Sequence, residues 1–529
     1  MGYKRSEVQF FHQDSVKKAI VALSSAKQLL IYCGAGVTID RTGLGWKQLI
    51  ANVFADAGGV EVGDPTAEEI EKIASEEDPQ RLASMLMQYR LSHEGGFAEV
   101  KRFLTPRLQQ QLYKSTGWQQ GLLTKNIIRL AVGAVRLGRG VTIVTTNYDT
   151  YLEQSFDKYV REVAQADSRH LPGLEVQVLG SKPYLRRQSD NSISPVRLIY
   201  LHGRVPPPPG QARGRLVVSE IEYSETRSHV VDQLRHLFSA RRTGVLIVGS
   251  SLTDPPLIEA LAFTRARSDR YALMPMSSTP YWNTYELDTV RLAQHMQARC
   301  ELMSVALLLP DFKYQVAQFC QEALLCMSEG AESFMLTESR SRYGLRLRTW
   351  WEAWTQTEMY GSINKPYAVL ADKVKELKDK LSPLTPPSDE GPELFKLEVW
   401  TRYNPSESSR RLALWASSAG TLTDRDILKY EQLALASSQA SIRAFIEGRP
   451  QYISLDELQA PGSFARSRWK SFLSVPIYVA TSKGQLPVGA VTLASTRRKE
   501  SSGIRQGQVK QMEGLVEQLI HVGRLILSA

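Results

Sequence analysis

Four short segments of the chain carry the polar and glycine residues best suited to chemistry, and each directly follows a short apolar run. Glycines at the end of a strand leave backbone N–H groups open to an anion, and histidine is the side chain that exchanges a proton near neutral pH. Ligands of open parallel sheets bind at the edge where the strands end. The pattern predicts a site for an anionic ligand on four segments: CGAG (33–36), TTNYDTYLE (145–153), LHG (201–203) and VGSSLTDPPL (248–257).

Each segment also has a purely structural interpretation. The glycines at 34–36 lack the GxGxxG spacing of the ordinary dinucleotide fingerprint, so a tight turn alone would explain them. Asn147, Asp149 and Asp254 are residue types that are common at helix caps. A histidine at the end of a core strand, such as His202, more often serves packing than catalysis. The functional interpretation depends on all four segments ending strands of one sheet.

Short apolar, β-prone runs separated by helical segments predict the sheet that must position these residues. Such strands, alternating with helices, indicate a mostly parallel sheet covered on both faces. We therefore predict an α/β, Rossmann-like domain over residues 1–328, with a helical insertion at about 47–137. The predicted strands are LLIY (29–32), VTIVTT (141–146), RLIYLHG (197–203), GRLVVS (214–219), VLIVGS (245–250), YALMPM (271–276) and SVALLLP (304–310).

The hydrophobic period changes in the last third of the chain. Residues 329–392 predict a helical connector that ends in the Pro-rich linker SPLTPPSDEGP (382–392). Residues 393–529 predict an antiparallel sheet with helices packed on it, a C-terminal α+β domain. Its predicted elements are strands in FKLEVWTRYN, RRLALWASS, PQYISL, SFLSVPIYVA and LPVGAVTLAS, a helix over 426–448, and a closing helix over 509–527.

Composition and charge exclude several classes of protein. With 43% hydrophobic and 23% charged residues, the chain is not wholly disordered, and it contains no apolar run of the roughly 18–20 residues that span a bilayer. Because residues 1–18 show no apolar core and no cleavage site, we expect no secretory signal. Four cysteines without a CxxC pair provide no zinc ribbon, so we expect a reducing cytoplasm and no metal.

The net charge of +10 comes in blocks rather than in one basic run. Residues 51–100 hold 3 Lys/Arg against 11 Asp/Glu, whereas residues 101–150 hold 8 against 1. This distribution is typical of solvated helix faces, so nucleic acid is not favoured as a partner. A polyanion or an anionic cofactor stays open as the alternative.

In this order and spacing, the four segments resemble the sirtuin-like family of NAD-consuming domains over about residues 1–328. The residues that carry the resemblance are Gly34-Ala35-Gly36, Gly43-Leu44-Gly45-Trp46, Thr146-Asn147-Tyr148-Asp149, His202-Gly203, and Gly249-Ser250-Ser251 with Asp254-Pro255. Thr38 stands where many members have Ser, and Gly45 where Pro is common. Because the zinc ribbon of the protein-deacylating members is missing, the chain is more similar to the defence-type branch, which hydrolyses NAD⁺.

The resemblance implies an NAD⁺ glycohydrolase that releases nicotinamide, with NAD⁺ as substrate and no metal. Asn147 and His202 are then the catalytic residues: Asn147 orients ribose hydroxyls or water, and His202 acts as general base with an ordinary pKa near 6.5. Asp149 holds the loop of Asn147. The implied NAD⁺-binding residues are Gly34, Ala35, Gly36, Thr38, Asp40, Trp46, Asp149, Gly249, Ser250, Ser251 and Asp254.

Residues 393–529 resemble a GAF domain in SSQASIRAFIEGRPQYI, RSRWKSFLSVPIYV and LPVGAVTLAS. The resemblance implies a sensor or dimerisation domain, so we expect a homo-oligomer without membrane contact whose activity answers to a small-molecule or protein trigger. The family context suggests an anti-phage abortive-infection effector. The alternative is a sensor or scaffold that binds NAD or ADP-ribose without turnover; lysine deacylation is disfavoured by the missing zinc ribbon.

Overall fold

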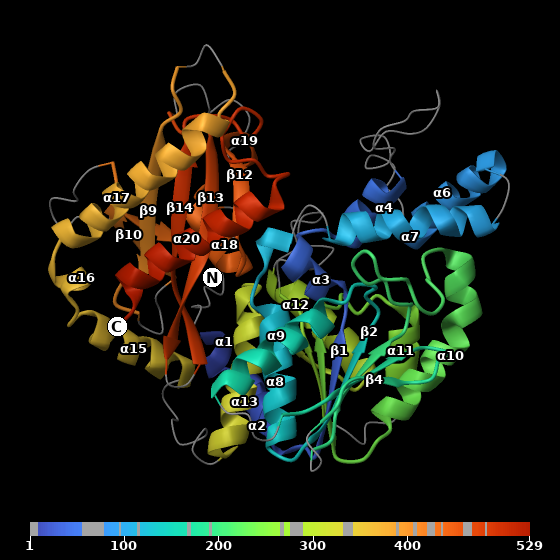
Figure 1. Cartoon of the computed structure of the whole chain (residues 1–529). Helices are drawn as coiled ribbons and strands as arrows, with labels where there is room; N and C mark the ends of the chain where they lie inside the picture. The colour runs from blue at the N-terminus through green and yellow to red at the C-terminus, as the bar shows by residue number, and fades with distance from the viewer. Residues whose placement is uncertain are drawn as a thin grey trace.

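A computed structural model shows two β-sheets with their helices, packed side by side (Figure 1). The structure describes residues 9–54, 79–94, 97–113, 117–166, 171–189, 193–264, 269–275, 289–331, 342–387, 391–405, 410–419, 429–434, 437–458, 468–481 and 484–529. The predicted helical segment PTAEEIEKIASEE (65–77) and Met276 of the strand YALMPM lie outside these residues.

The first sheet has eight strands in the order β4-β3-β5-β2-β1-β6-β7-β8. All neighbours pair in parallel except β3 and β4, which confirms the predicted mostly parallel α/β sheet. Its strands are β1 (Gln28–Cys33), β2 (Gly140–Thr145), β3 (Leu174–Val178), β4 (Tyr184–Arg187), β5 (Val196–Tyr200), β6 (Thr243–Val248), β7 (Asp269–Leu273) and β8 (Ala306–Leu308).

Helices cover both faces of this sheet. Because successive residues of a strand point to opposite sides, the two faces of the central strand β1 (Gln28–Cys33) pack against different helices. On β1, Ile31 joins a core that includes α2, α8, α9 and α13, whereas Leu30 and Tyr32 join a second core with α10, α11 and α12. These helices are α2 (Asp14–Ser25), α8 (Leu123–Arg136), α9 (Tyr151–Ala166), α10 (Glu220–Phe238), α11 (Pro255–Phe263), α12 (Thr289–Leu302) and α13 (Tyr314–Glu329). A short helix, α1 (Gln9–His12), precedes α2.

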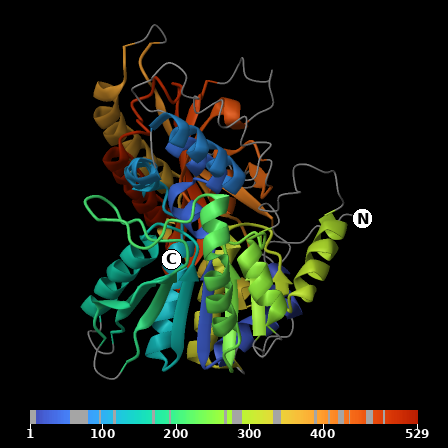
Figure 2. The ribbon, with the colours of Figure 1, turned by 90° about the vertical axis from the view of Figure 1, so that its right-hand side faces the viewer.

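The predicted helical insertion lies over one end of the sheet (Figures 1 and 2). Its core contains Leu49, Leu82 and Leu108 together with Tyr148 and Val205, which follow strands β2 and β5. The insertion therefore covers the edge where the strands end. The helices before α8 are α3 (Ala35–Thr42), α4 (Trp46–Phe54), α6 (Pro79–Glu94), α7 (Phe97–Tyr113) and the 3-10 turn η1 (Gly117–Gln119).

The second sheet has six strands in the order β11-β10-β9-β14-β13-β12, all antiparallel. This confirms the predicted antiparallel sheet of the C-terminal region. Its strands are β9 (Phe395–Arg402), β10 (Arg411–Ser417), β11 (Tyr430–Gln432), β12 (Gln451–Ser454), β13 (Ser471–Thr481) and β14 (Gly484–Ser495). Its helices are α18 (Ala440–Glu447), α19 (Leu455–Leu458) and α20 (Val509–Leu527).

Helices α15 (Arg342–Trp354), α16 (Glu358–Gly361) and α17 (Asn364–Leu381), with the turn η3 (Ser382–Leu384), connect the sheets. The indole N–H groups of Trp350 and Trp354 donate to the carbonyls of Leu527 and Ile526, at 2.9 and 2.8 Å. These carbonyls belong to the last turn of α20, which has no intrahelical partners for them. The connector thus holds the C-terminal helix in place.

Two local predictions are wrong. Residues 214–219 (GRLVVS) do not form a strand: Leu216 and Val218 pack into the core of the helical insertion, which explains why they are apolar. The helix predicted over 426–448 begins only at Ala440, because Tyr430–Gln432 pairs with β10 instead. Strands β3 and β4 were not predicted. Residues 388–390 of the linker and 426–428 of that helix lie outside the described residues.

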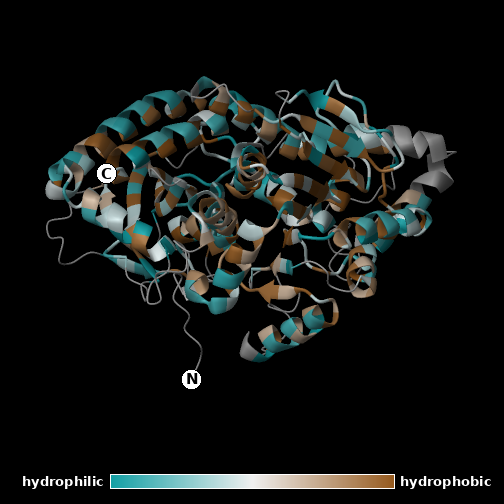
Figure 3. Cartoon of the chain, turned by 90° about the horizontal axis from the view of Figure 1, so that it is seen from below, coloured by the Kyte–Doolittle hydropathy of each residue, from teal (hydrophilic) through white to brown (hydrophobic). Residues whose placement is uncertain are grey.

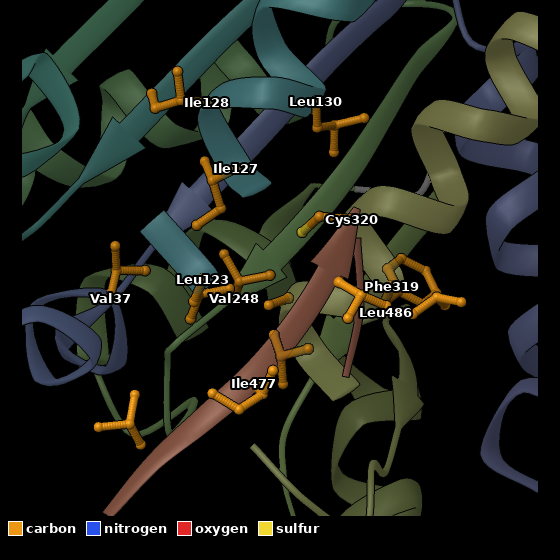
Figure 4. Close-up of a cluster of buried hydrophobic side chains, with 14 of the residues drawn as sticks. Val37, Leu123, Ile127, Ile128, Leu130, Val248, Phe319, Cys320, Ile477 and Leu486 are labelled. Atoms are coloured by element: carbon orange, nitrogen blue, oxygen red, sulfur yellow. The ribbon is translucent and has the colours of Figure 1, made fainter. Parts of the chain in front are cut away.

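The two sheets share one hydrophobic core. Val37, Leu123 and Phe319 of the first part contact the same cluster as Ile477 and Leu486 of the second (Figure 4). Hydrophobic residues fill the interior of both parts, and hydrophilic residues cover much of the outer helices (Figure 3). In the part of the chain that the structure describes, no helix has the length and apolar character to cross a membrane.

Candidate functional site

The four predicted segments meet at one edge of the eight-stranded sheet. Strand β1 pairs in parallel with β2 and β6, and β2 pairs in parallel with β5, so the segments that follow these strands are neighbours. Leu201 donates its N–H to the carbonyl of Thr145 at 2.9 Å, and Val205 donates to Tyr148 at 2.7 Å. The segment of His202 therefore runs beside the segment of Asn147.

The glycine turn after β1 lies directly against the backbone that follows β6. A Cβ atom on Gly34 would come within 2.6 Å of the Gly249 carbonyl oxygen, and one on Gly36 within 2.6 Å of the Gly249 Cα. The N–H groups of Gly34 and Gly36 donate to the carbonyls of Val248 (2.9 Å) and Gly249 (2.7 Å). In this structure the two amides are thus occupied by protein, and the glycines serve close backbone packing.

Gly36→Ala should lower the free energy of unfolding by about 1–3 kcal/mol, because a methyl group there meets backbone atoms that cannot move independently. Gly45→Ala is the matched control, since nothing lies within 4 Å of a Cβ at that position. Denaturant unfolding of both variants measures the difference. Equal stability of the two variants would show that the turn tolerates the methyl group.

Asn147 is held in place by hydrogen bonds between neighbouring strand ends. Its Nδ2 donates to the carbonyl of Gly34 at 2.9 Å, and its backbone N–H donates to Oγ1 of Thr145 at 3.0 Å. The Thr145 hydroxyl donates in turn to the carbonyl of Cys33 at 3.0 Å. Because only 9% of Asn147 is exposed, these bonds are shielded from water and fix the side chain at the junction of β1 and β2.

Asp149 ties the same segment to helix α3. It accepts a hydrogen bond from the Thr38 hydroxyl and another from the N–H of Tyr151 at 3.0 Å, at the start of α9. Burial raises the pKa of this carboxyl above its ordinary value. The guanidinium of Arg41 lies over the Tyr151 ring, 4.6 Å from its centroid, and its charge opposes this rise. Thr38 and Asp149 therefore position the loop that carries Asn147.

His202 is buried with a free ring nitrogen. Only 7% of the residue is exposed, its ring packs edge-on against Tyr223 with 5.5 Å between centroids, and Nε2 has no hydrogen-bond partner among the described residues. Burial lowers the pKa of His202 to about 4. The ordinary value near 6.5 that the sequence suggested therefore does not hold in the folded protein. The imidazole is neutral at pH 7.

This burial predicts a pH-dependent stability. The unfolded state binds a proton at His202 near pH 6.5 and the folded state near pH 4, so protonation favours unfolding as the pH falls through this window. Relative to His202→Asn, the wild type should lose about 2 kcal/mol between pH 7 and pH 5. Denaturant unfolding at both pH values measures the change.

The comparison with His202→Asn cancels other groups that titrate in this window. Asp254 is one of them: burial raises its pKa to about 6, so its contribution has the opposite sign and destabilises the fold as the pH rises. A difference between wild type and variant that stays constant from pH 7 to pH 5 would contradict the burial of a neutral His202.

A cavity of about 400 Å³ adjoins the glycine turn on the side of the second sheet. The predicted residues that line it are Ala35, Gly36, Asp40, Gly249, Ser250 and Ser251. Its far wall includes Lys313 and the segment 447–449 at the end of α18. Asn147 and His202 are not among the lining residues. The predicted site thus divides into a cavity beside Gly249 and a buried cluster beside His202, both at the same sheet edge.

Hydrogen bonds and a ring contact hold three further predicted residues against the elements around the site. Asp40 accepts a hydrogen bond from the N–H of Thr124 at 3.2 Å, which joins α3 to α8. Asp254 accepts one from the Tyr32 hydroxyl at 3.1 Å, at the start of α11. The ring of Trp46 lies 5.4 Å from that of Tyr148. These contacts orient the strand-end segments.

The hydroxyls of the segment after β6 are paired locally. Oγ of Ser250 accepts the N–H of Leu252 at 3.1 Å, and Oγ of Ser251 lies 2.6 Å from Oγ1 of Thr253. The turn is thus folded by its own side chains, and Ser251 is exposed at the cavity.

Glu153, the last residue of TTNYDTYLE, has a structural role that the sequence pattern did not predict. Glu153 is fully buried, and its two carboxylate oxygens accept from Nε and Nη2 of Arg204 at 2.6 and 2.8 Å. Tyr200 and Arg186 donate to the same carboxylate at 2.8 and 2.7 Å. This network fixes the chain just after His202 to helix α9. The signal in the sequence was an acidic residue in the first turn of an amphipathic helix.

Comparison with known proteins gives a partial match. The family model of the SIR2-like domain matches residues 141–295, from β2 to α12. Two solved structures are distantly similar. One is a Sir2 homologue in complex with NAD, with 11% identity, 60% of this chain and 94% of that chain covered, and a TM-score of 0.29. The other is a mutant Sir2 homologue in complex with ADP-ribose, with 13% identity, 58% and 97% covered, and a TM-score of 0.25.

No curated protein matches the chain. Within the described residues, no cluster of three or more His, Cys, Asp or Glu is arranged to hold a metal ion.

Proposed function

We propose that the chain hydrolyses NAD⁺ to nicotinamide and ADP-ribose, and that this activity serves anti-phage defence. One observation carries the hydrolase proposal. A neutral, buried His202 with an unpartnered Nε2 lies beside the Asn147 segment, within the stretch that matches the SIR2-like domain. An unpaired buried nitrogen of this kind costs stability, and such costs are typical of functional sites.

Cleavage of the nicotinamide–ribose bond requires the protein mainly to position NAD⁺ and the attacking water. The nicotinamide of NAD⁺ is already a cationic leaving group, so loss of the glycosidic bond needs no strong acid. A neutral His202 accepts a hydrogen bond from a ribose hydroxyl or from the attacking water, and Asn147 orients the same groups. The cavity beside Gly249 and Ser251 takes the remainder of the dinucleotide. The match of residues 141–295 to the SIR2-like domain supports NAD⁺ as the ligand.

His202→Ala and Asn147→Ala should each reduce nicotinamide release by about 10²–10⁴-fold, because each removes a group that acts on the ribose or the water. Chromatography of free nicotinamide after incubation with NAD⁺ measures the rate. His229→Ala is the matched control, because His229 lies exposed on α10, away from the strand ends. Release at the wild-type rate by both site variants would refute the assignment.

A second candidate function is binding of NAD or ADP-ribose without turnover. It is favoured by the division of the site, since the cavity beside Gly249 does not include His202 in its lining. Calorimetric titration with NAD⁺, followed by analysis of the same sample for nicotinamide, separates the two functions. Saturable binding with intact NAD⁺ would support the sensor, and released nicotinamide would support the hydrolase.

We further propose that the C-terminal part, as a GAF-like sensor and oligomerisation domain, controls access to this cavity. Gly448 and Arg449 form part of the cavity wall opposite Gly249. Arg449 donates to the side-chain oxygen of Gln119 at 2.7 Å, and Lys313 pairs with Glu447 at 2.8 Å. These contacts hold the segment against the first part. A trigger that moves the segment would open the cavity, which is the behaviour an abortive-infection effector needs.

Arg449→Gln should raise basal nicotinamide release by about fivefold, the effect of losing a contact of about 1 kcal/mol that keeps the cavity closed. Arg443→Gln is the control on the preceding helix α18, since Arg443 donates to the carbonyls of Ser437 and Glu457 and does not line the cavity. Unchanged or reduced release by Arg449→Gln would argue against restraint by this segment.

A further inference from the structure

A second and larger cavity, of about 620 Å³, lies between the two sheets and outside the site described above. One wall comes from α3, α8 and α9 of the first part, and the other from β13, α20, Gly448 and Pro450. Its volume falls in the range of about 300–1,000 Å³ that is typical of small-molecule sites. Neither Asn147, His202 nor the segment 249–251 lines it.

Among the charged side chains that line this cavity, basic residues outnumber acidic ones. Six are basic and two are acidic. One of the acidic residues, Asp157, is already paired with Arg186 at 2.7 Å, and Arg186 does not line the cavity. The basic residues are Arg41, Lys125, Arg129, Lys158, Arg161 and Arg524.

These positive charges line one cavity, and most of them lack a carboxylate partner at salt-bridge distance within the described residues. In the described part of the chain, Lys125, Lys158 and Arg524 form no ion pair, and Nε of Arg41 is buried without a hydrogen-bond partner. Burial, together with the charges of Lys158 and Arg41, lowers the pKa of Lys125 to about 8. Like charges held together in a partly enclosed space repel one another. Binding of an anion relieves this repulsion and is therefore electrostatically favourable.

Apolar and aromatic residues complete the cavity. Leu122, Ile520 and Tyr478 line it alongside the basic groups. Mixed walls of this kind suit a ligand with both a charged and an apolar part. We propose that the cavity binds a phosphorylated small molecule with at least two phosphate groups, held by Lys125, Lys158 and Arg41 from the first part and Arg524 from the second.

The site bridges the two parts of the chain and is independent of the proposed NAD⁺ hydrolysis. Leu122, Gly448 and Tyr478 line both this cavity and the one beside Gly249. The ligand therefore contacts the same residues that form the wall of the candidate nucleotide cavity, which makes it a candidate for the trigger.

Calorimetric titration of the full chain with inorganic tripolyphosphate tests the site, in metal-free buffer at constant ionic strength. The wild type should bind one equivalent, and Lys125→Gln/Lys158→Gln should bind about tenfold more weakly or worse, because charge-assisted bonds are lost. The single variant Arg524→Gln, exposed on α20, should also weaken binding. Lys375→Gln, exposed on α17 and outside the cavity, is the matched control and should bind like the wild type.

Repeating the titration in saturating NAD⁺ distinguishes this site from the nucleotide cavity. Saturable binding of one equivalent that persists in saturating NAD⁺ supports two separate sites, whether or not NAD⁺ is hydrolysed, and coupling between the cavities shifts its Kd only by a finite factor. Strict competition, in which the apparent Kd rises in proportion to the NAD⁺ concentration, would place the anion in the nucleotide cavity and overturn the proposal. The proposal also fails if the wild type shows no saturable binding up to about 1 mM. It fails equally if Arg524→Gln and the double variant keep the wild-type affinity, or if Lys375→Gln loses as much as they do.

Discussion

The approach of two backbones, at the end of β1 and the end of β6, is the constraint on which the candidate site depends. Gly34 and Gly36 have no side chain because the Gly249 backbone occupies that space, and their N–H groups bond to the carbonyls of Val248 and Gly249. This contact sets where α3 begins. Since α3 carries Thr38, which holds Asp149, the same contact also fixes the loop of Asn147.

The buried polar groups at this edge of the sheet differ in whether they have hydrogen-bond partners. Glu153 and Arg204 are both buried, and because each neutralises the other in a bidentate pair, they form a rigid support. His202, two residues before Arg204, has an unpartnered Nε2 among the described residues and stays neutral because burial disfavours its charge. A rigid, fully paired neighbour keeps such a nitrogen from relaxing into another contact. The surrounding structure therefore keeps Nε2 of His202 buried without a hydrogen-bond partner, although this arrangement costs stability.

The sequence predicts the parallel sheet and the meeting of the four segments because both follow from local patterns. Apolar runs fix the strands, and the ends of parallel strands share one edge. Residues 214–219 have the same apolar character, yet they pack against the helical insertion, a long-range contact that no local pattern contains. The pKa of His202 was missed for the same reason, since burial depends on Tyr223 and the other elements packed around it. Neither cavity could be predicted from the sequence, because the walls consist of residues that only the tertiary fold brings together. In the larger cavity, Arg41 and Arg524 are such a pair.

The shared core explains how the C-terminal part can influence the first sheet. Ile477 and Leu486 pack in one cluster with Phe319 and Leu123, so the two parts cannot separate without exposing apolar surface. We therefore expect any relative motion to affect polar contacts of the interface, such as Arg449 with Gln119, before this core. The larger cavity lies at a polar part of the interface, whereas the cavity beside Gly249 is lined in part by Leu123 and Val316 of the shared core, and Tyr478 lines both. A ligand that changes the position of Tyr478 in one cavity would therefore change the shape of the other. Such coupling requires only that the ligand binds more tightly when Tyr478 is in one position than when it is in the other.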